Sequence, residues 1–396
     1  MKNNRKVLKN KSVLVGITGG VSAYKSVDLI RRLREEGAQV TVVMTEAAKH
    51  FVTPLSLEVA SRNKVYGDLY SAPMAHIALP AGADIMVIAP ATADIIGKFA
   101  HGIASDLLSL SFLSFKGKIV IAPAMNWRMY GHPVFQSNLA TLLKLGVIQV
   151  GPEKGSLACG EDGIGRMAEV PDIIEAVKSA LAVKDLAAER ILVTAGPTRE
   201  YLDPVRFLSN RSSGKMGYAL AGAALRRGAH VTLVSGPSPL PQPKGIKFIS
   251  VDTAKEMQRA VNRELVSVTI LIMAAAVSDF MPEKKSGDKI EKSKELLLKV
   301  ARTPDILSEI GKRNNRPFIV GFAAETGQKL GKARKKLHAK NMDLIVFNDV
   351  TKAGSGFDVD TNKVSLIDKE KEIELPLLDK DEVADAILDR IAELRA

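Results

Sequence analysis

Two short apolar runs each lead into glycine and hydroxyl residues of the kind that bind phosphate. The first, residues 13–25, is Val-Leu-Val-Gly-Ile-Thr-Gly-Gly-Val-Ser-Ala-Tyr-Lys, and the second, residues 191–200, is Ile-Leu-Val-Thr-Ala-Gly-Pro-Thr-Arg-Glu. In a doubly wound sheet such a turn lies at the carboxyl end of a strand, where backbone amides at a helix start attract anions. The two turns therefore predict two ligand sites, and two chemistries, on one polypeptide.

The first turn departs from the strict Gly-x-Gly-x-x-Gly pattern of dinucleotide-binding proteins. A tight connection between strand and helix explains Gly19 and Gly20 as well as phosphate binding does. If an anion binds here, Thr18, Ser22 and the amides after Gly19 would hold it at the helix start.

Polar residues follow two later strands of the first half. Pro90 and Thr92 occur in Ala-Pro-Ala-Thr-Ala (89–93), and Asn126 ends Pro-Ala-Met-Asn (123–126). Pro90 blocks strand pairing, and Thr92 can contact a ring or a phosphate. An asparagine at the exposed end of a strand can hold a carboxylate or an amide.

His76 and Cys159 are the two candidates for proton transfer. A single histidine is more often structural than catalytic, and His76 stands alone. Cys159 is followed by glycines at 160, 163 and 165, which predict a loop. A cysteine in such a loop meets a substrate more readily than one on an apolar helix face.

The second half contains a loop that resembles a P-loop without being one. In residues 209–216, Ser209 replaces the first required glycine, and Met216 replaces the residue that would bind magnesium. The loop can still hold a phosphate at a helix start. A dinucleotide site is excluded in detail, because the second strand ends in Val-Ser-Gly-Pro (234–237), with no acidic residue for a ribose.

Several residues of the second half could bind a nucleotide or have ordinary structural roles. Asp279 follows an apolar strand, where it can cap a turn or contact a ligand. Lys336 and Lys340 share a helix face and could clamp a polyphosphate, although lysines of this kind, Lys289 included, are equally typical of a solvated surface. Phe322 ends another strand and could form the floor of a base pocket.

Length and composition set the class of protein. A chain of 396 residues predicts two or three domains. It has no apolar run of membrane-spanning length, and residues 1–11 are a poor match to a signal peptide. The single cysteine excludes an internal disulfide and fits a reducing cytosol, so a cytoplasmic protein is expected. One cysteine and six scattered histidines give no zinc-ligand spacing.

The net charge of +12 has three explanations: a solvated lysine-rich surface, an anionic small ligand, or nucleic acid. Scattered basic residues, 5% aromatic content and the absence of a nucleic-acid-binding motif argue against the third. Neither a nucleic-acid partner nor a membrane is therefore expected.

Apolar runs alternate with helical patterns in both halves, which predicts an α/β protein with two doubly wound domains, residues 1–190 and 191–396. Strands are expected at 13–17, 40–44, 85–89, 119–122, 147–150, 191–195, 230–235, 247–251, 269–274, 318–323 and 344–347, with a hairpin at 363–368 and 371–375. Helices are expected at 22–36, 54–61, 91–99, 105–112, 132–145, 171–182, 180–190, 214–227, 254–264, 304–313, 328–339 and 381–396. Residues 281–294 are polar and aperiodic, which predicts a flap over a site.

The first half resembles the FMN-dependent cysteine decarboxylases of coenzyme A biosynthesis. The motifs that carry the resemblance are Gly-x-Thr-Gly-Gly-x-x-Ala-Tyr-Lys (16–25), His76, Ala-Pro-Ala-Thr-Ala-Asp (89–94), Pro-Ala-Met-Asn (123–126), Ala-Cys-Gly (158–160) and Gly-Arg-Met (165–167). The resemblance implies a flavodoxin-like FMN domain acting on 4′-phosphopantothenoylcysteine. His76 would be the base, Asn126 with Met125 would bind the departing carboxylate, and Cys159 would protonate the reduced intermediate. It also implies that FMN contacts Gly19, Gly20, Ser22, Thr45, Pro90, Thr92 and Ser105.

The second half resembles the CTP-dependent phosphopantothenate–cysteine ligases, so the two resemblances cover essentially the whole chain. The resemblance implies a Rossmann-like domain that joins 4′-phosphopantothenate to L-cysteine through an acyl-cytidylate, with Mg²⁺ accompanying CTP through unidentified protein ligands. Lys289 would stabilise the activation step, although Glu291 departs from the Lys-Ile-Lys-Lys that the family commonly shows. The acyl-phosphate site would comprise Arg206, Asn210, Ala275 and Ala276. The nucleotide site would comprise Asp279, Pro304, Asp305, Ile306, Leu307, Phe322, Lys336 and Lys340.

The resemblance further implies a homo-oligomer, with trimeric contacts in the first half, dimeric contacts in the second and assemblies up to a dodecamer. Two other functions would require different features. A flavoprotein fused to a short-chain dehydrogenase would need a Tyr-x-x-x-Lys pair after the fourth strand, and the second half has none. A basic nucleic-acid-binding protein would show strongly salt-dependent DNA retention and no flavin colour.

Overall fold

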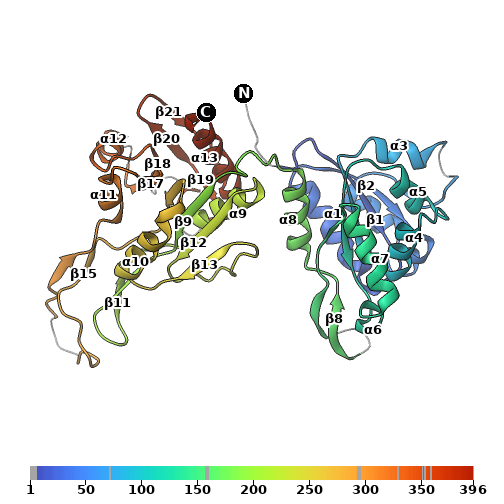
Figure 1. Ribbon diagram of the computed structural model, residues 1–396, viewed down its shortest axis with the longest axis horizontal. Helices are drawn as coiled ribbons and strands as arrows, with labels where there is room; N and C mark the ends of the chain where they lie inside the picture. Colours follow the sequence, from blue (N-terminus) through green and yellow to red (C-terminus); the bar gives the residue numbers. More distant parts are fainter. Residues whose placement is uncertain are drawn as a thin grey trace. The chain divides into compact units, whose positions relative to one another are not determined.

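The computed structural model describes residues 7–70, 73–156, 160–291, 296–327, 330–349, 351, 354–356 and 359–395. The chain divides into two compact units, 1–182 and 183–396, and each has its own sheet and helices (Figure 1). Residues just after 182 contact the second unit, where the Leu186 amide donates to the Arg227 carbonyl at 3.1 Å.

The first unit contains a parallel six-stranded sheet. In spatial order its strands are β3 (Val65–Tyr66), β2 (Gln39–Met44), β1 (Ser12–Ile17), β4 (Ile85–Ala91), β5 (Lys118–Pro123) and β6 (Ile148–Gln149). Without the two-residue edge strand β3, this is the flavodoxin-like order, which confirms the expected fold class. The direction of winding reverses between β1 and β4, and a crevice forms where their carboxyl ends diverge.

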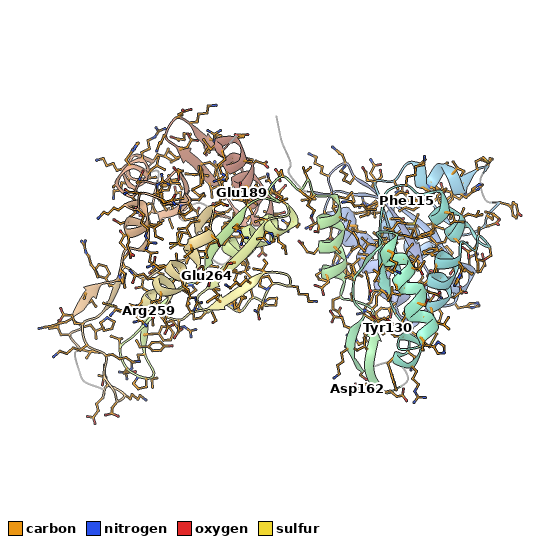
Figure 2. All side chains as sticks on the ribbon, in the orientation of Figure 1. Phe115, Tyr130, Asp162, Glu189, Arg259 and Glu264 are labelled. Atoms are coloured by element: carbon orange, nitrogen blue, oxygen red, sulfur yellow. The ribbon has the colours of Figure 1, made fainter. Side chains whose placement is uncertain are left out.

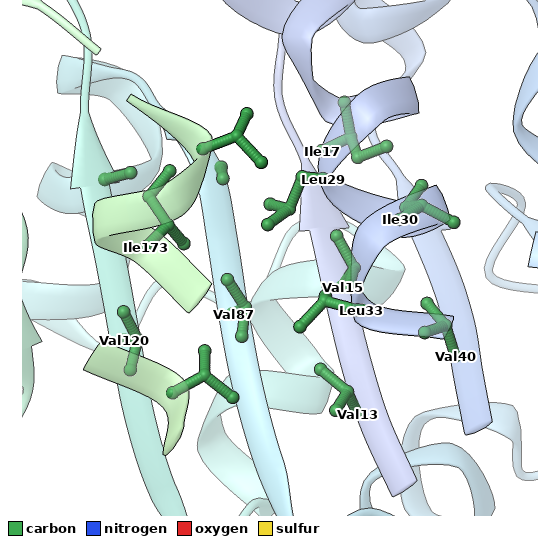
Figure 3. Packing of buried hydrophobic residues seen from close by; sticks show 14 of the residues in the cluster. Val13, Val15, Ile17, Leu29, Ile30, Leu33, Val40, Val87, Val120 and Ile173 are labelled. Atoms are coloured by element: carbon green, nitrogen blue, oxygen red, sulfur yellow. The ribbon is translucent and has the colours of Figure 1, made fainter. Parts of the chain in front are cut away.

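Helices cover both faces of this sheet (Figure 1). They are η1 (Val21–Tyr24), α1 (Lys25–Glu35), η2 (Glu46–His50), α2 (Pro54–Ser61), α3 (Ala75–Ala81), α4 (Ala93–His101), α5 (Leu107–Ser114), α6 (Trp127–Tyr130), α7 (Pro133–Lys144) and α8 (Val170–Leu181). Alternate residues of β1 face opposite cores: Val13 and Val15 pack with α1 and α8 (Figure 3), whereas Leu14 belongs to the cluster with α4, α5 and α7. Burial on both faces explains why these strands are apolar throughout.

Two expectations for the first half are wrong. Residues 180–190 do not form a helix, because α8 ends at Leu181 and residues 185–188 form a turn. Lys184 donates to the Arg226 carbonyl at 2.5 Å, so tertiary contacts override the helical propensity of this alanine-rich stretch. The glycine-rich segment near Cys159 is not entirely a loop either: β7 (Glu153–Ser156) and β8 (Asp162–Arg166) form an antiparallel hairpin.

The second unit contains an eight-stranded sheet. In spatial order its strands are β13 (Lys247–Ser250), β12 (His230–Ser235), β9 (Arg190–Ala195), β14 (Ile270–Met273), β17 (Phe318–Glu325), β18 (Leu344–Asp349), β20 (Val364–Asp368) and β21 (Glu372–Glu374). The first six are parallel, in the Rossmann order, and the last two form the predicted antiparallel hairpin. The winding reverses between β9 and β14.

Helices pack on both faces of the second sheet. α9 (Lys215–Arg226) and α13 (Lys380–Arg395) contribute to one core, and α10 (Ala254–Glu264), α11 (Ile306–Gly311) and α12 (Leu330–Ala339) contribute to the other, with η3 (Leu265–Ser267) after α10. No helix among the residues described here is long and apolar enough to cross a membrane.

Three small two-stranded sheets of the second unit were not predicted. They pair β10 (Arg199–Tyr201) with β11 (Phe207–Ser209), β15 (Phe280–Pro282) with β16 (Val300–Arg302), and β19 (Thr361–Asn362) with β22 (Leu378–Asp379). Strands this short carry too few residues to show an alternating pattern. The expected flap therefore begins as a strand, and we call residues 283–291 the flap segment.

Asp385, on α13 where it packs against α9, predicts a pH-dependent stability. Burial raises its pKa from 3.8 to about 6, although Arg226 and Arg227 oppose the shift. The folded state therefore binds a proton more tightly than the unfolded state, and this group lowers stability as the pH rises from about 4 to about 6. Asp385→Asn should stabilise the second unit by up to about 3 kcal/mol above pH 6, at about 1.4 kcal/mol per pH unit, and by little at pH 4.

Scanning calorimetry at pH 4 and pH 8 measures this difference without relying on Trp127, the single tryptophan, which lies in the first unit. The control is Glu370→Gln, which removes one carboxylate charge at an exposed position between β20 and β21 and should alter stability by less than about 0.5 kcal/mol. Equal stabilisation by Asp385→Asn at both pH values would contradict the prediction.

Candidate functional sites

A cavity of about 1000 Å³ opens at the carboxyl ends of the first unit's strands. Its wall comes from the segments that follow β1, β2, β4 and β5 and from β8. Of the predicted site residues, Gly19, Gly20, Ser22, Thr45, Thr92, Ser105, Met125 and Asn126 line it. The cavity is also lined by charged residues for which no individual role was predicted: Lys25, Asp94 and Arg166, which belong to the quoted motifs, and Glu46, Lys98 and Asp106.

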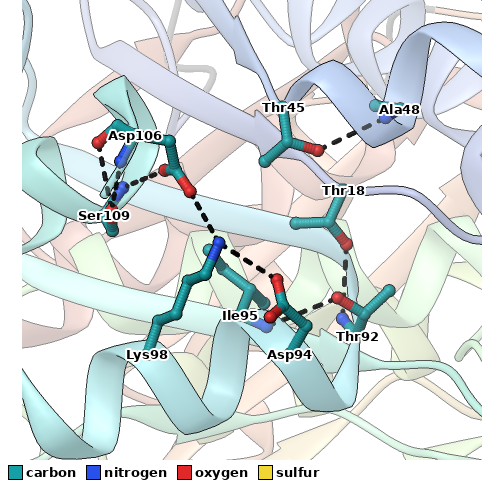
Figure 4. Close-up of polar contacts among 9 residues, drawn as sticks. All are labelled: Thr18, Thr45, Ala48, Thr92, Asp94, Ile95, Lys98, Asp106 and Ser109. Carbon is teal, nitrogen blue, oxygen red and sulfur yellow. Dashed lines mark hydrogen bonds and ion pairs between the residues drawn. The ribbon is translucent and has the colours of Figure 1, made fainter. Parts of the chain in front are cut away.

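The segments after β1 and β4 are joined by hydrogen bonds beside the cavity (Figure 4). The Thr18 hydroxyl donates to the Pro90 carbonyl at 2.7 Å and accepts from the Thr92 amide at 3.3 Å. Pro90 therefore supports the wall from behind and is not among the residues that line it. Thr92 in turn caps α4 by accepting from the Ile95 amide.

A close backbone approach explains the glycine at position 19. A Cβ atom there would lie 2.5 Å from the Ala47 Cβ and 2.9 Å from the Ala47 carbonyl oxygen. Thr45, whose hydroxyl accepts from the Ala48 amide, fixes this neighbouring turn (Figure 4). The two segments thus bring hydroxyl groups and backbone amides to one corner of the cavity, an arrangement suited to an anion.

A lysine with two carboxylate neighbours forms another part of the wall (Figure 4). Lys98 Nζ lies 3.0 Å from Asp106 Oδ2 and 3.2 Å from Asp94 Oδ2. Burial opposes ionisation of Asp106, but the Ser109 amide and Lys98 outweigh it and hold the pKa of Asp106 below its ordinary value. Both charges are therefore present at neutral pH, and the pair joins α4 to the start of α5.

Met125 and Asn126 occupy the wall because β8 packs against their backbone. The Met125 amide donates to the Gly165 carbonyl at 3.0 Å. A Cβ at Gly165 would lie 2.0 Å from the Met125 carbonyl oxygen, and one at Gly163 would lie 2.6 Å from the Trp127 Cβ. These glycines therefore permit strand-to-backbone contact and do not simply loosen a loop. Figure 2 labels Tyr130 and Asp162 on α6 and β8, which contact each other.

Neither of the two expected proton-transfer residues is among the described residues that line the cavity. Cys159 lies outside the described residues. His76 is half-buried on α3, and its carbonyl accepts from the Ser114 hydroxyl at 2.6 Å. Ser114 ends α5, and Asp106, which lines the cavity, caps its start, so a rise of 1.5 Å per residue places these two residues about 12 Å apart along the helix. His76 does not line the cavity of its own chain.

In the second unit, the predicted acyl-phosphate residues meet at the carboxyl ends of β9 and β14. The Ala275 amide donates to the Thr194 hydroxyl at 3.2 Å, and the Ala276 amide donates to the Gly196 carbonyl at 2.9 Å. Asn210 donates from Nδ2 to the Val277 carbonyl at 2.9 Å. The structure therefore brings Asn210, Ala275 and Ala276 together at this edge of the sheet.

Backbone hydrogen bonds and ion pairs link the segments that carry the predicted nucleotide-binding residues. The Thr303 amide donates to the Asp279 carbonyl at 3.1 Å, and Lys340 pairs with Asp305 at 2.9 Å. Asp305 also caps α11, the helix that begins with Ile306 and Leu307, and directly follows Pro304. On β17, which carries Phe322, Glu325 pairs with Lys336 at 2.7 Å. The two lysines therefore have carboxylate partners that sequence analysis did not anticipate.

Arg206 contacts the flap segment instead of Asn210. Its Nη1 donates to the Ile290 carbonyl at 3.0 Å and lies 3.5 Å from Asp203 Oδ2. Asp203 is fully buried, and although burial opposes ionisation, amides of Val205, Arg206 and Ile290 hold its pKa below the ordinary value. Lys289 precedes Ile290 and is exposed.

Comparisons with known proteins agree with the division of the chain into two units. Residues 1–182 match the family described as Flavoprotein, and residues 186–394 match the DNA/pantothenate metabolism flavoprotein C-terminal domain. The coenzyme A biosynthesis bifunctional protein CoaBC of Vibrio cholerae is 46% identical over 98% of this chain and 99% of its own length, and that of Escherichia coli K12 is 45% identical over 97% of each. The Bacillus subtilis protein is 44% identical over 98% of each.

Solved structures match each unit separately. The C-terminal domain of a CoaBC protein is 41% identical over 53% of this chain and 97% of its own, with a TM-score of 0.47. The FMN-dependent cysteine decarboxylase SpaF is 31% identical over 44% of this chain and 97% of its own, with a TM-score of 0.39.

The fold and the sites define a two-domain α/β enzyme, a flavoprotein domain followed by a Rossmann-like domain. The chain belongs to the family of bifunctional coenzyme A biosynthesis proteins. It is accordingly a bifunctional enzyme, with a decarboxylase in the flavoprotein domain and a ligase in the C-terminal domain.

The contact between β8 and Met125 predicts that a single methyl group added at Gly165 slows decarboxylation. Gly165→Ala would place Cβ 2.0 Å from the Met125 carbonyl oxygen, so β8 and the segment with Met125 and Asn126 must shift apart, and all three residues line the cavity. Decarboxylation should fall by about tenfold or more, because small displacements of positioning groups are costly. Ligation, carried out by the other unit, should be unchanged.

The matched control is Gly82→Ala, whose added Cβ would meet nothing nearer than 3.7 Å. It should leave both activities near the wild-type rate in separate assays of carbon dioxide release and pyrophosphate release. A Gly165→Ala enzyme with a normal decarboxylation rate would show that the Met125 segment tolerates the displacement.

Proposed function

We propose that this enzyme makes 4′-phosphopantetheine from 4′-phosphopantothenate, L-cysteine and CTP. The ligase would join cysteine to phosphopantothenate, and the decarboxylase would remove the carboxylate of the cysteine moiety. The observation that carries the proposal is the presence of both family matches in one chain, each over one of its two compact units. The product of the first reaction is the substrate of the second, which gives the fusion a chemical purpose.

The cavity of the first unit fits FMN. Its volume of about 1000 Å³ lies at the upper end of the 300–1000 Å³ common for cofactor sites. Ser22 and the amides after Gly19, at the start of η1 and α1, would hold the phosphate, and Thr45, Thr92 and Ser105 offer hydroxyl groups farther along the wall. The bound flavin would supply the electron sink that decarboxylation next to an unactivated carbon requires.

Asn126 would bind the departing carboxylate from the wall of this cavity. Its Oδ1 accepts from the Arg128 amide at 2.8 Å, which orients the side chain at the start of α6. Met125 would pack beside the same group, fixed by its bond to Gly165. Cys159, which directly precedes Gly160 near β8, would provide the final proton.

His76 does not line the cavity of its own chain, so we assign its role as the base to the site of a neighbouring subunit. We therefore propose a homo-oligomer in which α3 of one subunit completes the cavity of the next, as trimeric contacts in the decarboxylase would allow. A head-to-tail ring of this kind gives every subunit one complete site.

For the ligase, the carboxylate of phosphopantothenate would attack the α-phosphate of CTP and release pyrophosphate. The amine of cysteine would then displace CMP from the acyl-cytidylate. Asn210 with Ala275 and Ala276 would hold the acyl phosphate, and Asp279, Phe322 and the start of α11 would hold the cytidine. Lys336 and Lys340 would exchange their carboxylate partners for polyphosphate oxygens.

Magnesium would arrive with the nucleotide. Among the described residues, no group of three or more His, Cys, Asp or Glu side chains could hold a metal ion. Mg²⁺ is commonly bound by substrate phosphates with one or two carboxylates, so such a cluster is not required. Dimeric contacts in the second unit complete the proposal for assembly.

Incubation with 4′-phosphopantothenate, cysteine, CTP and Mg²⁺, followed by mass spectrometry, tests the whole function. We expect 4′-phosphopantetheine together with CMP. Omission of CTP should abolish both products, because the free acid does not form the amide. Folded yellow protein that gives no product would refute the proposed substrates.

Mixing two inactive variants tests the proposed origin of His76. His76→Asn and Asn126→Asp should each ligate normally and fail to decarboxylate. If each site combines the cavity of one subunit with His76 of the next, oligomers reassembled from equal amounts should recover about a quarter of the wild-type decarboxylation rate, since random neighbours pair correctly in that fraction.

The control is each variant unfolded and reassembled alone, which should stay inactive. Failure of the mixture to recover activity, with mixed oligomers demonstrated by mass spectrometry, would mean that His76 serves its own chain or has no catalytic role.

A further inference from the structure

The flap segment is held against residues 201–203 at three points in succession. The Lys285 ammonium lies 5.0 Å from the centre of the Tyr201 ring, the Ser286 amide donates to the Leu202 carbonyl at 2.8 Å, and the Ile290 amide donates to Asp203 Oδ2 at 3.1 Å. Three residues, 287–289, therefore form a short loop between two hydrogen-bonded ends.

Both carboxylate oxygens of Asp203 accept hydrogen bonds, and one of them accepts from the flap segment. Its Oδ1 accepts from the amides of Val205 and Arg206, both at 2.7 Å, while its Oδ2 faces Ile290. Arg206 reinforces the same point, because it donates to the Ile290 carbonyl at 3.0 Å. A fully buried carboxylate is tolerated only when its oxygens are satisfied. Here the turn uses one oxygen, and the flap segment uses the other.

Lys289 directly precedes Ile290 but takes no part in the hydrogen bond between Ile290 and Asp203, which we call the anchor. Its side chain is exposed and has no hydrogen-bond or ion-pair partner within the described ranges. Adjacent Cα atoms are about 3.8 Å apart, so fixing Ile290 also fixes the backbone position of Lys289. The ammonium group of Lys289 therefore remains available for a ligand, while the backbone of this residue is held in place.

We propose that Asp203 is a positioning residue for the activation step, since its bond to the Ile290 amide holds Lys289 where the α-phosphate of the nucleotide reacts. The inference rests on the proposed role of Lys289. Asp203 itself touches neither substrate nor nucleotide and acts through the flap segment, so its loss should affect the release of pyrophosphate and not the binding of cysteine.

Asp203→Asn tests the anchor, because its amide group would present N–H to the Ile290 N–H while the remaining oxygen still accepts from the turn. Pyrophosphate release should slow by about 10- to 100-fold, chiefly in kcat. Hydrogen exchange followed by mass spectrometry should show faster exchange in a peptide covering 284–291. Glu283→Gln, the same chemical change at an exposed flap position, should alter neither quantity.

Ile290→Pro supplies a second test that leaves Asp203 itself unchanged, because it removes the N–H donor of the flap segment, although it also fixes φ at position 290 and restricts Lys289. It should slow pyrophosphate release to a similar extent. Decarboxylation by the first unit should be normal in both variants, and circular dichroism should show a folded second unit.

The double variant Asp203→Asn/Lys289→Gln separates positioning from a general structural role. If Asp203 acts through Lys289, the double variant should be no slower than Lys289→Gln alone. The inference would be overturned if the two substitutions slowed pyrophosphate release additively. It would also be overturned if Asp203→Asn released pyrophosphate at the normal rate while Lys289→Gln was slow. Normal pyrophosphate release by Lys289→Gln itself would instead remove Lys289 from the activation step, and the proposed role would fail with it.

Discussion

Parallel strand pairing at the point where the winding reverses is the constraint on which both sites depend. In the first unit β1 pairs with β4, and in the second β9 pairs with β14, so each sheet has two neighbouring strands whose following segments turn toward opposite faces. In open α/β sheets, ligands bind at such a point, beyond the carboxyl ends of the strands. The cavity of the first unit and the Asn210–Ala276 cluster of the second both lie at such an edge.

Close backbone contact, made possible by glycine, shapes these edges. Gly19 lets the turn after β1 contact Ala47, and Gly165 lets β8 pack directly on Met125. In the second unit a Cβ at Gly236 would lie 1.8 Å from the Pro197 carbonyl oxygen, so the turns after β9 and β12 also touch through their backbones. Side chains such as Asn126 thereby gain a fixed support, which positioning within a fraction of an ångström requires.

Charge at the sites is arranged in pairs. Lys98 with Asp106, Lys336 with Glu325, and Lys340 with Asp305 each place a cation near a strand end with a carboxylate beside it. A net charge of +12 alone did not distinguish a solvated surface from an anionic ligand. Under the proposed function, Lys336 and Lys340 would exchange these carboxylate partners for phosphate oxygens.

Local signals in the sequence determined most of the elements. The bounds of β12 and α10 follow from an apolar run and from a Thr253–Glu256 capping box, both encoded within a few residues. Family motifs likewise located the Gly19 turn and the Met125–Asn126 wall. Only tertiary structure decided the β7–β8 hairpin, the separation of His76 from its own cavity, and the bond from Asp203 to Ile290 across 87 residues. Those features depend on contacts between segments far apart in the chain, and neither propensity nor spacing along the sequence carries that information.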